Sequence, residues 1–197
     1  RVGNEAGGNG LETTQLSNFT ATSDNSGAKE LWRGPWAGIS RTNWILTNID
    51  KSPKISDAKK TQYKGEAHFL RGLYYFNLVR LFGDVPWIDK QQTASDDLQV
   101  SRTSKDIVYQ HIIDDFSDAA SMLPAVYENT TDIGRATKGA AFGLLAKVYL
   151  TLKRYNETLV AIDSVMNLGV YSLNRKYEWN FSDLRENGPE SLFEVQY

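Results

Sequence analysis

The sequence predicts an all-α protein built from antiparallel helical hairpins, with long loops and little strand. The first observation is a stretch at residues 57–82 whose apolar side chains recur every three or four positions, which is the spacing of an α-helical turn. The second is that the same spacing returns at 105–123 and again at 139–172. The third is that we recognise alternation typical of a strand only near the C-terminus, at residues 193–197.

The composition limits the classes of function. The chain has 197 residues, enough for one sizeable domain, and its 41% hydrophobic and 23% charged residues are ordinary for a globular protein. Its 22 basic and 24 acidic residues give a formal net charge of −2, so no basic surface favours nucleic acid. The absence of cysteine excludes disulfides and Cys-based metal sites. No apolar run reaches the length that a membrane-spanning helix requires.

The N-terminal part is predicted to be a loop followed by one long helix. Residues 1–28 are rich in Gly, Asn, Ser and Thr and carry little apolar periodicity, which indicates a loop. A helix is expected from about Ala28 to Asp50, with a break or restart at Pro35. Its predicted apolar face comprises Leu31, Trp32, Trp36, Ile39, Asn43 and Leu46. Trp44 is expected to share that face and to pack in the core.

The stretch at 57–82 is the most informative element. Ser56 or Asp57 can cap its start, Gly83 permits a left-handed cap, and Pro86 forbids continuation. One apolar stripe comprises Tyr63, Ala67, Leu70, Tyr74, Leu78 and Leu81, and a second comprises Phe69, Leu73, Phe76 and Val79. A helix that is apolar on more than one side needs neighbours on more than one side, which predicts a layered helical array.

A long connection and a third helix follow. The connection at 83–103 is long for a compact domain, which indicates a loop used for function or interaction. Trp87 within it is expected to face solvent. Thr103 and Asp106 resemble a helix-start box. The next helix has Val108, Ile112, Phe116, Ala119 and Leu123 at helical spacing and ends at Pro124.

Residues 139–172 match the tetratricopeptide pattern, in which two antiparallel helices approach closely at a small residue. The matching positions are Phe142, Leu145, Ala146 and Tyr149 in the first helix, Tyr155 at the turn, and Ile162 and Val165 in the second. Thr158 stands where the pattern has Ala, so we expect a looser or rotated contact there. A degenerate unit pairs Gly72 and Tyr75 with Phe116, Ala119 and Pro124. Two such units predict a short right-handed superhelix.

Four motifs occur in a fixed order along the chain. They are G-I-S-R-T-N at 38–43, A-H-F-L-R-G-L-Y-Y-F-N-L-V-R-L-F-G-D-V-P at 67–86, G-R-A-T-K-G-A-A at 134–141 and E-S-L-F-E-V-Q-Y at 190–197. Together they resemble the SusD/RagB family of outer-membrane nutrient-binding lipoproteins, over roughly residues 29–197. We therefore expect a loop region at 1–28, a helical-repeat domain at 29–182 and the start of a following segment at 183–197.

The resemblance also implies a function. Members of this family capture a nutrient on the outer leaflet of the outer membrane and pass it to a TonB-dependent, SusC-like transporter. The expected ligand is an oligosaccharide or a peptide, with no cofactor and no catalytic or metal-binding residue. The chain begins at Arg1 without Met, so we expect a fragment whose lipid anchor lies upstream. Two alternatives stay open, a helical-repeat adaptor for protein partners and an all-helical carbohydrate-active enzyme.

Candidate site residues are chosen by their position, because the resemblance indicates a region for the site and matches none of its residues individually. The family's glycan pocket draws on the loop before the first long helix and on the C-terminal half. The candidates are Asn4, Glu5, Asn9, Asn18 and Phe19 in that loop, and Trp87 in the 83–103 connection.

Other polar residues are expected to have structural roles. His68 and His111 lack the spacing of metal ligands, and no pair of carboxylates is in register for glycoside hydrolysis. Arg71 and Arg80 are expected to bind loop carbonyls or carboxylates at the edges of the helical array. Two further residues have the same kind of expected role, Asn43 toward a backbone group and Glu66 toward a nearby cation.

Overall fold

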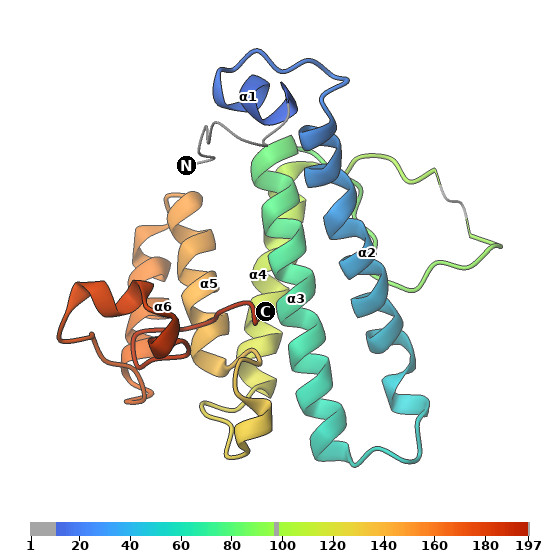
Figure 1. The fold of residues 1–197 in the computed structure, drawn as a ribbon. Coiled ribbons are helices and arrows are strands. Elements are labelled where there is room, and N and C mark those ends of the chain that lie inside the picture. The colour runs from blue at the N-terminus through green and yellow to red at the C-terminus, as the bar shows by residue number, and fades with distance from the viewer. Residues whose placement is uncertain (1–10, 97–98, 197) are drawn as a thin grey trace.

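The computed structural model describes residues 11–96 and 99–196 (Figure 1). These residues form α1 (Leu11–Ser17), α2 (Ser26–Asn48), α3 (Asp57–Phe82), α4 (Lys105–Met122), α5 (Lys138–Thr151) and α6 (Tyr155–Met166). Four short 3₁₀ helices accompany them, η1 (Ile49–Lys51), η2 (Thr130–Asp132), η3 (Tyr177–Phe181) and η4 (Asp183–Arg185). Among these described residues the sole β-type pairing is an isolated bridge between Val85 and Thr103. The predicted all-α class is confirmed.

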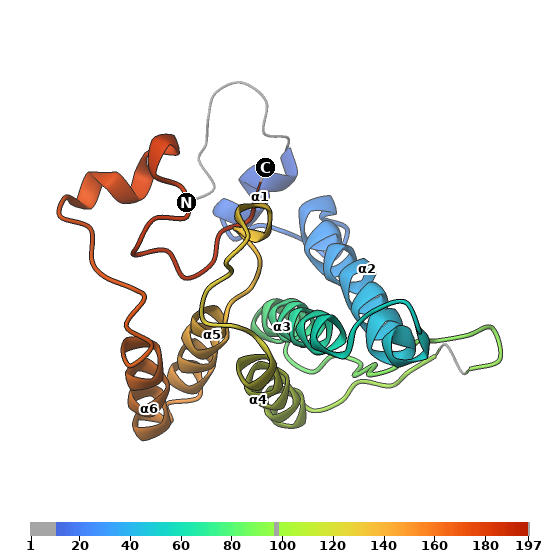
Figure 2. The ribbon, with the colours of Figure 1, turned by 90° about the horizontal axis from the view of Figure 1, so that it is seen from below.

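The helices from α2 to α6 form an arc in which each packs against the next in sequence. Figure 2 shows the arc nearly end-on, with α3 between α2 and α4, and with α5 and α6 continuing on the far side of α4. Antiparallel neighbours that repeat in this way are the hairpins of a tetratricopeptide-like superhelix. The core lies along α3 and α4.

Helix α3 has the predicted bounds and is buried on more than one side. Ser56 caps it by accepting a hydrogen bond from the Lys59 amide, and Gly83 follows it with a φ of 71°. The buried members of both predicted stripes are Ala67, Phe69, Phe76, Leu78 and Val79. The assignment of Leu81 to the buried stripe is wrong, because this residue is 56% exposed in the last turn of α3.

Helix α2 runs through Pro35 without the predicted break. Because Gly34 has no Cβ to clash with the proline ring, the helical conformation is tolerated before Pro35. Asn25 caps the start of α2 by accepting a hydrogen bond from the Ala28 amide (2.9 Å). Trp32 and Trp36 pack against the core as expected, but Trp44 is 56% exposed and does not.

A short helix occupies part of the predicted N-terminal loop. The loop prediction is wrong for α1, and residues 1–10 lie outside the described part of the chain. The sequence of α1 has only two apolar residues, too few for a recognisable helical stripe. A side-chain hydrogen bond from Asn25 to Gln15 (2.9 Å) ties the end of α1 to the start of α2.

The 83–103 connection is closed at its base and projects beyond α2 (Figure 1). The Thr103 amide donates to the Val85 carbonyl (3.0 Å). The predicted start box of Thr103 and Asp106 is wrong, since α4 begins after Ser104, which makes no side-chain capping bond. Asp84, from the other end of the connection, accepts the Lys105 amide hydrogen bond instead (2.8 Å).

The α5–α6 hairpin shows the predicted close approach. Ala146 and Val165 are buried at the contact. Thr158 is also buried, and its hydroxyl donates to the Arg154 carbonyl (2.9 Å). A threonine therefore fits the position that usually holds alanine, because its own helix satisfies the hydroxyl. The prediction that Ile162 fills the core is wrong, as it is 44% exposed.

Two glycines set how closely the central helices approach. A Cβ at Gly72 would lie 3.1 Å from the Phe116 ring of α4, and a Cβ at Gly38 of α2 would overlap the Tyr74 ring of α3. The Tyr74 ring therefore occupies the space that a side chain at position 38 would need, and the Phe116 ring occupies the space that a side chain at position 72 would need.

We expect Gly38→Ala to destabilise the protein by about 1–2 kcal/mol, because overpacking costs about 1–3 kcal/mol and the gain in helix propensity returns at most about 1 kcal/mol. Urea denaturation measures the change. In a Tyr74→Ala background the same substitution should cost little or become favourable, since the clashing ring is gone. An equal cost in both backgrounds would contradict this explanation.

Candidate functional site

A buried ion pair lies at the centre of the helical array. Arg71 of α3 makes a two-pronged contact with Asp115 of α4, from Nε to Oδ2 (2.9 Å) and from NH2 to Oδ1 (2.7 Å). Both residues are buried, at 7% and 2% exposure. His68, one turn before Arg71, also contacts Asp115 Oδ1 through Nδ1 (2.7 Å). Burial by itself lowers the pKa of Arg71, but hydrogen bonding and the charge of Asp115 outweigh it, so the pKa is raised and the guanidinium stays charged.

This cluster holds the start of the 83–103 connection against the helices. Arg71 NH1 donates to the Asn43 side chain (3.0 Å) and to the Asp89 carbonyl (3.1 Å). Asn43 in turn donates to the Ile88 carbonyl (2.7 Å). The Tyr75 hydroxyl donates to the same carbonyl (3.2 Å) and accepts from the Ile88 amide (2.8 Å). Burial raises the pKa of Tyr75, which keeps its hydroxyl protonated as a donor.

Trp87 belongs to this packed region. Its ring stacks on His111, with ring centroids 4.4 Å apart and planes at 13°, and it lies 4.2 Å from the Tyr75 ring. The expectation that Trp87 faces solvent is wrong, since the ring is partly buried against the core. Pro86 stops the helix, but the aromatic neighbours from α3 and α4 decide where the next side chain goes.

Of the other polar residues, Glu66 has the cation partner that the sequence predicts, whereas the prediction for Arg80 is wrong, because this residue binds groups of its own helix and not a loop. Arg80 donates to the Phe76 carbonyl (3.2 Å) and to the Asn77 side chain (2.7 Å). Glu66 pairs with Arg135 (2.8 Å), which fixes the loop before α5 to α3. Because their hydrogen-bonding groups already have partners, we do not assign these residues to a ligand site.

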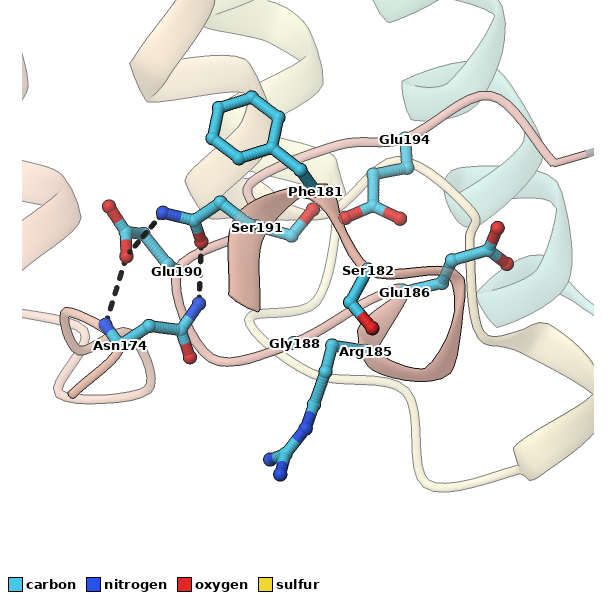
Figure 3. A pocket seen from close by; sticks show the side chains of 10 residues that line it. Asn174, Phe181, Ser182, Arg185, Glu186, Gly188, Glu190, Ser191 and Glu194 are labelled. Carbon is cyan, nitrogen blue, oxygen red and sulfur yellow. Dashed lines mark hydrogen bonds between the residues drawn. The ribbon is translucent and has the colours of Figure 1, made fainter. Parts of the chain in front are cut away.

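A surface hollow of about 450 Å³ lies in the irregular segment after α6 (Figure 3). Its lining combines amide, hydroxyl, carboxylate and guanidinium groups with one aromatic ring. The lining residues are Asn174, Asn180, Phe181, Ser182, Arg185, Glu186, Gly188, Glu190, Ser191 and Glu194. A volume in this range is typical of small-molecule sites. A second hollow of about 300 Å³ shares Gly188, Ser191 and Glu194 with it and extends toward the loop before α5.

Hydrogen bonds order the polar side chains of the larger hollow. Glu190 Oε2 accepts from the Asn174 amide (2.9 Å) and from Asn180 Nδ2 (3.1 Å). The Asn174 side chain donates to Asn180 Oδ1, which closes a ring of three residues. Figure 3 labels two of them, Asn174 and Glu190, at one side of the hollow. Glu194 Oε2 accepts from the Asn187 amide (2.9 Å). The hollow therefore presents side chains that are already oriented.

Aromatic rings lie beside this polar framework. Phe181 lines the hollow, is 72% exposed, and has its ring centroid 5.3 Å from that of Tyr177. The Arg185 guanidinium lies 4.1 Å above the Trp179 ring. An exposed ring next to ordered amides and carboxylates suits a ligand that has both C–H-rich faces and hydroxyl groups.

Within the residues that the structure describes, no group of three or more His, Asp or Glu side chains could hold a metal ion. Across that same part of the chain, no helix has the length and apolar character needed to cross a membrane.

The candidate residues predicted from the sequence do not gather at the hollow. Asn4, Glu5 and Asn9 lie outside the described residues. Asn18 and Phe19 follow α1 and are exposed, and Phe19 is 96% exposed with a φ of 57°. A left-handed conformation is uncommon for a bulky residue, so an exposed phenyl ring in that geometry is a reason to test it for binding.

The residues of the hollow were missed by reasoning from the sequence. The one available signal is the alternation of three aromatic residues with polar ones at 177–181, read as Y-E-W-N-F. This pattern does not show that Asn174 and Glu190 meet, because they lie 16 positions apart in irregular backbone.

The comparisons with known proteins agree with one another. A sequence profile described as starch-binding and associating with the outer membrane matches residues 4–150. A SusD-like protein of Bacteroides ovatus is 28% identical over 93% of this chain and 35% of its own length. SusD-like protein P2 of Formosa agariphila is 32% identical over 78% of this chain and 30% of its own length. The chain thus spans about a third of the length of the curated relatives it matches.

Solved structures give the same result. A SusD-like protein from Bacteroides fragilis superposes with a TM-score of 0.85 at 31% identity, over 93% of this chain and 36% of the other. A laminarin-binding SusD-like protein superposes with a TM-score of 0.82 at 28% identity, over 90% of this chain and 40% of the other. The tetratricopeptide-like arrangement is therefore shared with these proteins.

We expect Asp115→Asn to destabilise the protein by about 3–5 kcal/mol, because it leaves the buried Arg71 charge without its counter-charge. Glu157→Gln is the matched control. It makes the same change of group in an exposed ion pair between Glu157 of α6 and Arg154, the residue before that helix, and we expect little effect there. Chemical denaturation of both variants gives the comparison, and similar stabilities for the two would contradict the assigned role of Asp115.

Proposed function

The chain belongs to the SusD-like family of starch-binding proteins that associate with the outer membrane, and from this premise we propose that it binds an oligosaccharide at the cell surface. The hollow at residues 174–194 is the observation that carries the proposal. It combines an ordered Asn174–Asn180–Glu190 framework with the exposed Phe181 ring. Amides and carboxylates bind sugar hydroxyls, and a phenyl face packs on the C–H groups of a pyranose ring.

The N-terminal loop supplies a second contact in this proposal. The exposed ring of Phe19, in its left-handed turn, offers a stacking face, and Asn18 offers an amide beside it. Asn4, Glu5 and Asn9 stay predictions as further ligand contacts. Trp87 would act indirectly, by holding the 83–103 connection in place.

Delivery of the ligand completes the proposal. The bound oligosaccharide passes to a TonB-dependent, SusC-like transporter, and a lipid anchor on the N-terminal side keeps the protein on the outer leaflet of the outer membrane. The protein acts by capture and release rather than by catalysis. Residues 29–182 serve as the helical-repeat domain, 1–28 as the loop region before it, and 183–197 as the beginning of the next segment. The name of the laminarin-binding relative supports a glycan as the ligand.

A helical-repeat adaptor is the second candidate function. Helix α6 favours it, because several of its apolar side chains face solvent. Leu159, Val160 and Met166 are each more than 60% exposed, and an apolar helix face is a common docking surface for another helix.

A glycan array followed by isothermal titration with the bound glycan tests the first function. We expect Asn180→Ala and Phe181→Ala each to weaken binding about five- to thirtyfold, which corresponds to about 1–2 kcal/mol for a lost hydrogen bond or ring contact. Leu159→Ala on α6 is the control and should leave the affinity unchanged. An array with no glycan bound, or affinities unchanged in both hollow variants, would contradict the proposal for this site.

A pull-down from outer-membrane extracts tests the partner. We expect the intact protein to co-purify with a TonB-dependent transporter, and the complex to survive Asn180→Ala, because the ligand hollow is not the proposed docking surface. The adaptor function would be favoured if the pull-down recovered a different protein and Leu159→Ala abolished that recovery. The protein would also have to bind no glycan on the array.

A further inference from the structure

Starting from the proposed glycan-binding function, we infer that the hollow at residues 174–194 selects neutral saccharides and rejects acidic ones such as uronate oligomers. The inference concerns the charge of the ligand in this hollow: the family description names starch, which is neutral, and the lining of this chain's own hollow supports an uncharged ligand independently. Three features of the lining carry it: the number of carboxylates, the place of the single cation, and the hydrogen-bonding capacity that the framework leaves free.

The lining has an excess of negative charge. Glu186, Glu190 and Glu194 contribute three carboxylates, and Arg185 contributes the one basic side chain among the ten lining residues. In Figure 3 the glutamates lie around the hollow and the Arg185 side chain extends away from them. A ligand carboxylate that entered this space would meet charges of its own sign at short range, and like charges repel most strongly where water is partly displaced.

Arg185 is poorly placed to offset that repulsion. Its guanidinium lies over the Trp179 ring, 4.1 Å from the ring centre, a contact that is itself favourable for a cation. With three carboxylates and one guanidinium, the lining keeps an excess of negative charge.

The free hydrogen-bonding capacity suits hydroxyl groups. Glu190 and Glu194 each use Oε2 for protein donors, which leaves the second oxygen of each carboxylate available. Carboxylate oxygens only accept, so they need a ligand that donates. Sugar hydroxyls donate, whereas a uronate carboxylate does not. Ser182 and Ser191 in the same lining can complete the bonds of a hydroxyl by donating to its oxygen.

Matched pairs of oligosaccharides test the preference. Each pair has the same sugar stereochemistry, linkage and length and differs by CH2OH against COO⁻ at C6: mannohexaose and hexamannuronate, cellohexaose and hexaglucuronate, and galactohexaose and hexagalacturonate. Titration of the intact protein at low salt should give at least tenfold weaker binding for the acidic member of any pair that binds. The difference in affinity between the neutral and the acidic member should become smaller in 0.5 M NaCl, because salt screens the repulsion.

Charge variants locate the preference. Glu186→Gln and Glu194→Gln each remove one negative charge from the lining and keep the size of the side chain. Each should therefore reduce the ratio of neutral to acidic affinity about threefold. Glu178→Gln is the control, since Glu178 pairs with Lys176 and does not line the hollow, and it should leave that ratio unchanged.

Each outcome decides a separate point. If an acidic oligosaccharide binds as tightly as its neutral partner, the preference for neutral ligands is overturned, but the proposed glycan binding still stands. If the affinity ratio stays the same in Glu186→Gln and Glu194→Gln, the preference for neutral ligands does not arise in this hollow. If no member of any pair binds, the inference fails, and the glycan array decides the proposed function by itself.

Discussion

The Arg71–Asp115 ion pair is the interaction on which the rest of the structure depends. It joins α3 to α4, and through Asn43 and the carbonyls of Ile88 and Asp89 it also joins α2 and the long connection. A buried ion pair is stable only when its geometry is good and its other hydrogen bonds are made. Here the guanidinium has partners on Asp115, Asn43 and a backbone carbonyl, so three helices and one loop share a single arrangement.

Close packing surrounds this polar centre. Phe69, Tyr75, Phe76 and Phe116 are almost completely buried along α3 and α4. Gly72 allows the Phe116 ring to approach the backbone of α3, so the two helices come closer than larger residues would permit. The result is a scaffold whose side chains fix its geometry, as expected of tightly packed interiors.

The candidate site is built on irregular backbone that this scaffold supports. Phe193 packs against Phe69 of α3, with ring centroids 4.9 Å apart, which brings the C-terminal segment back to the core. The Gln196 side chain lies close to Gly134, in the loop before α5. The segment at 174–194, which follows α6 in the sequence and ends near these contacts, lines the hollow. In many binding proteins a rigid scaffold holds surface loops in place, and those loops carry the binding residues.

The sequence alone determined the five long helices, α2 to α6, and their order. Apolar spacing, a serine cap and a proline stop were sufficient for α3, and the small residues at Gly72 and Ala146 indicated which helices pair. The tertiary structure alone decided where isolated polar and aromatic residues lie. Trp87 turned inward because Tyr75 and His111 offered it rings, and Pro35 stayed helical because Gly34 removed the clash. The hollow brings Asn174, Asn180 and Glu190 together across irregular backbone. Helical periodicity is a local property that a sequence displays, whereas contacts between distant loop residues depend on the path of the whole chain.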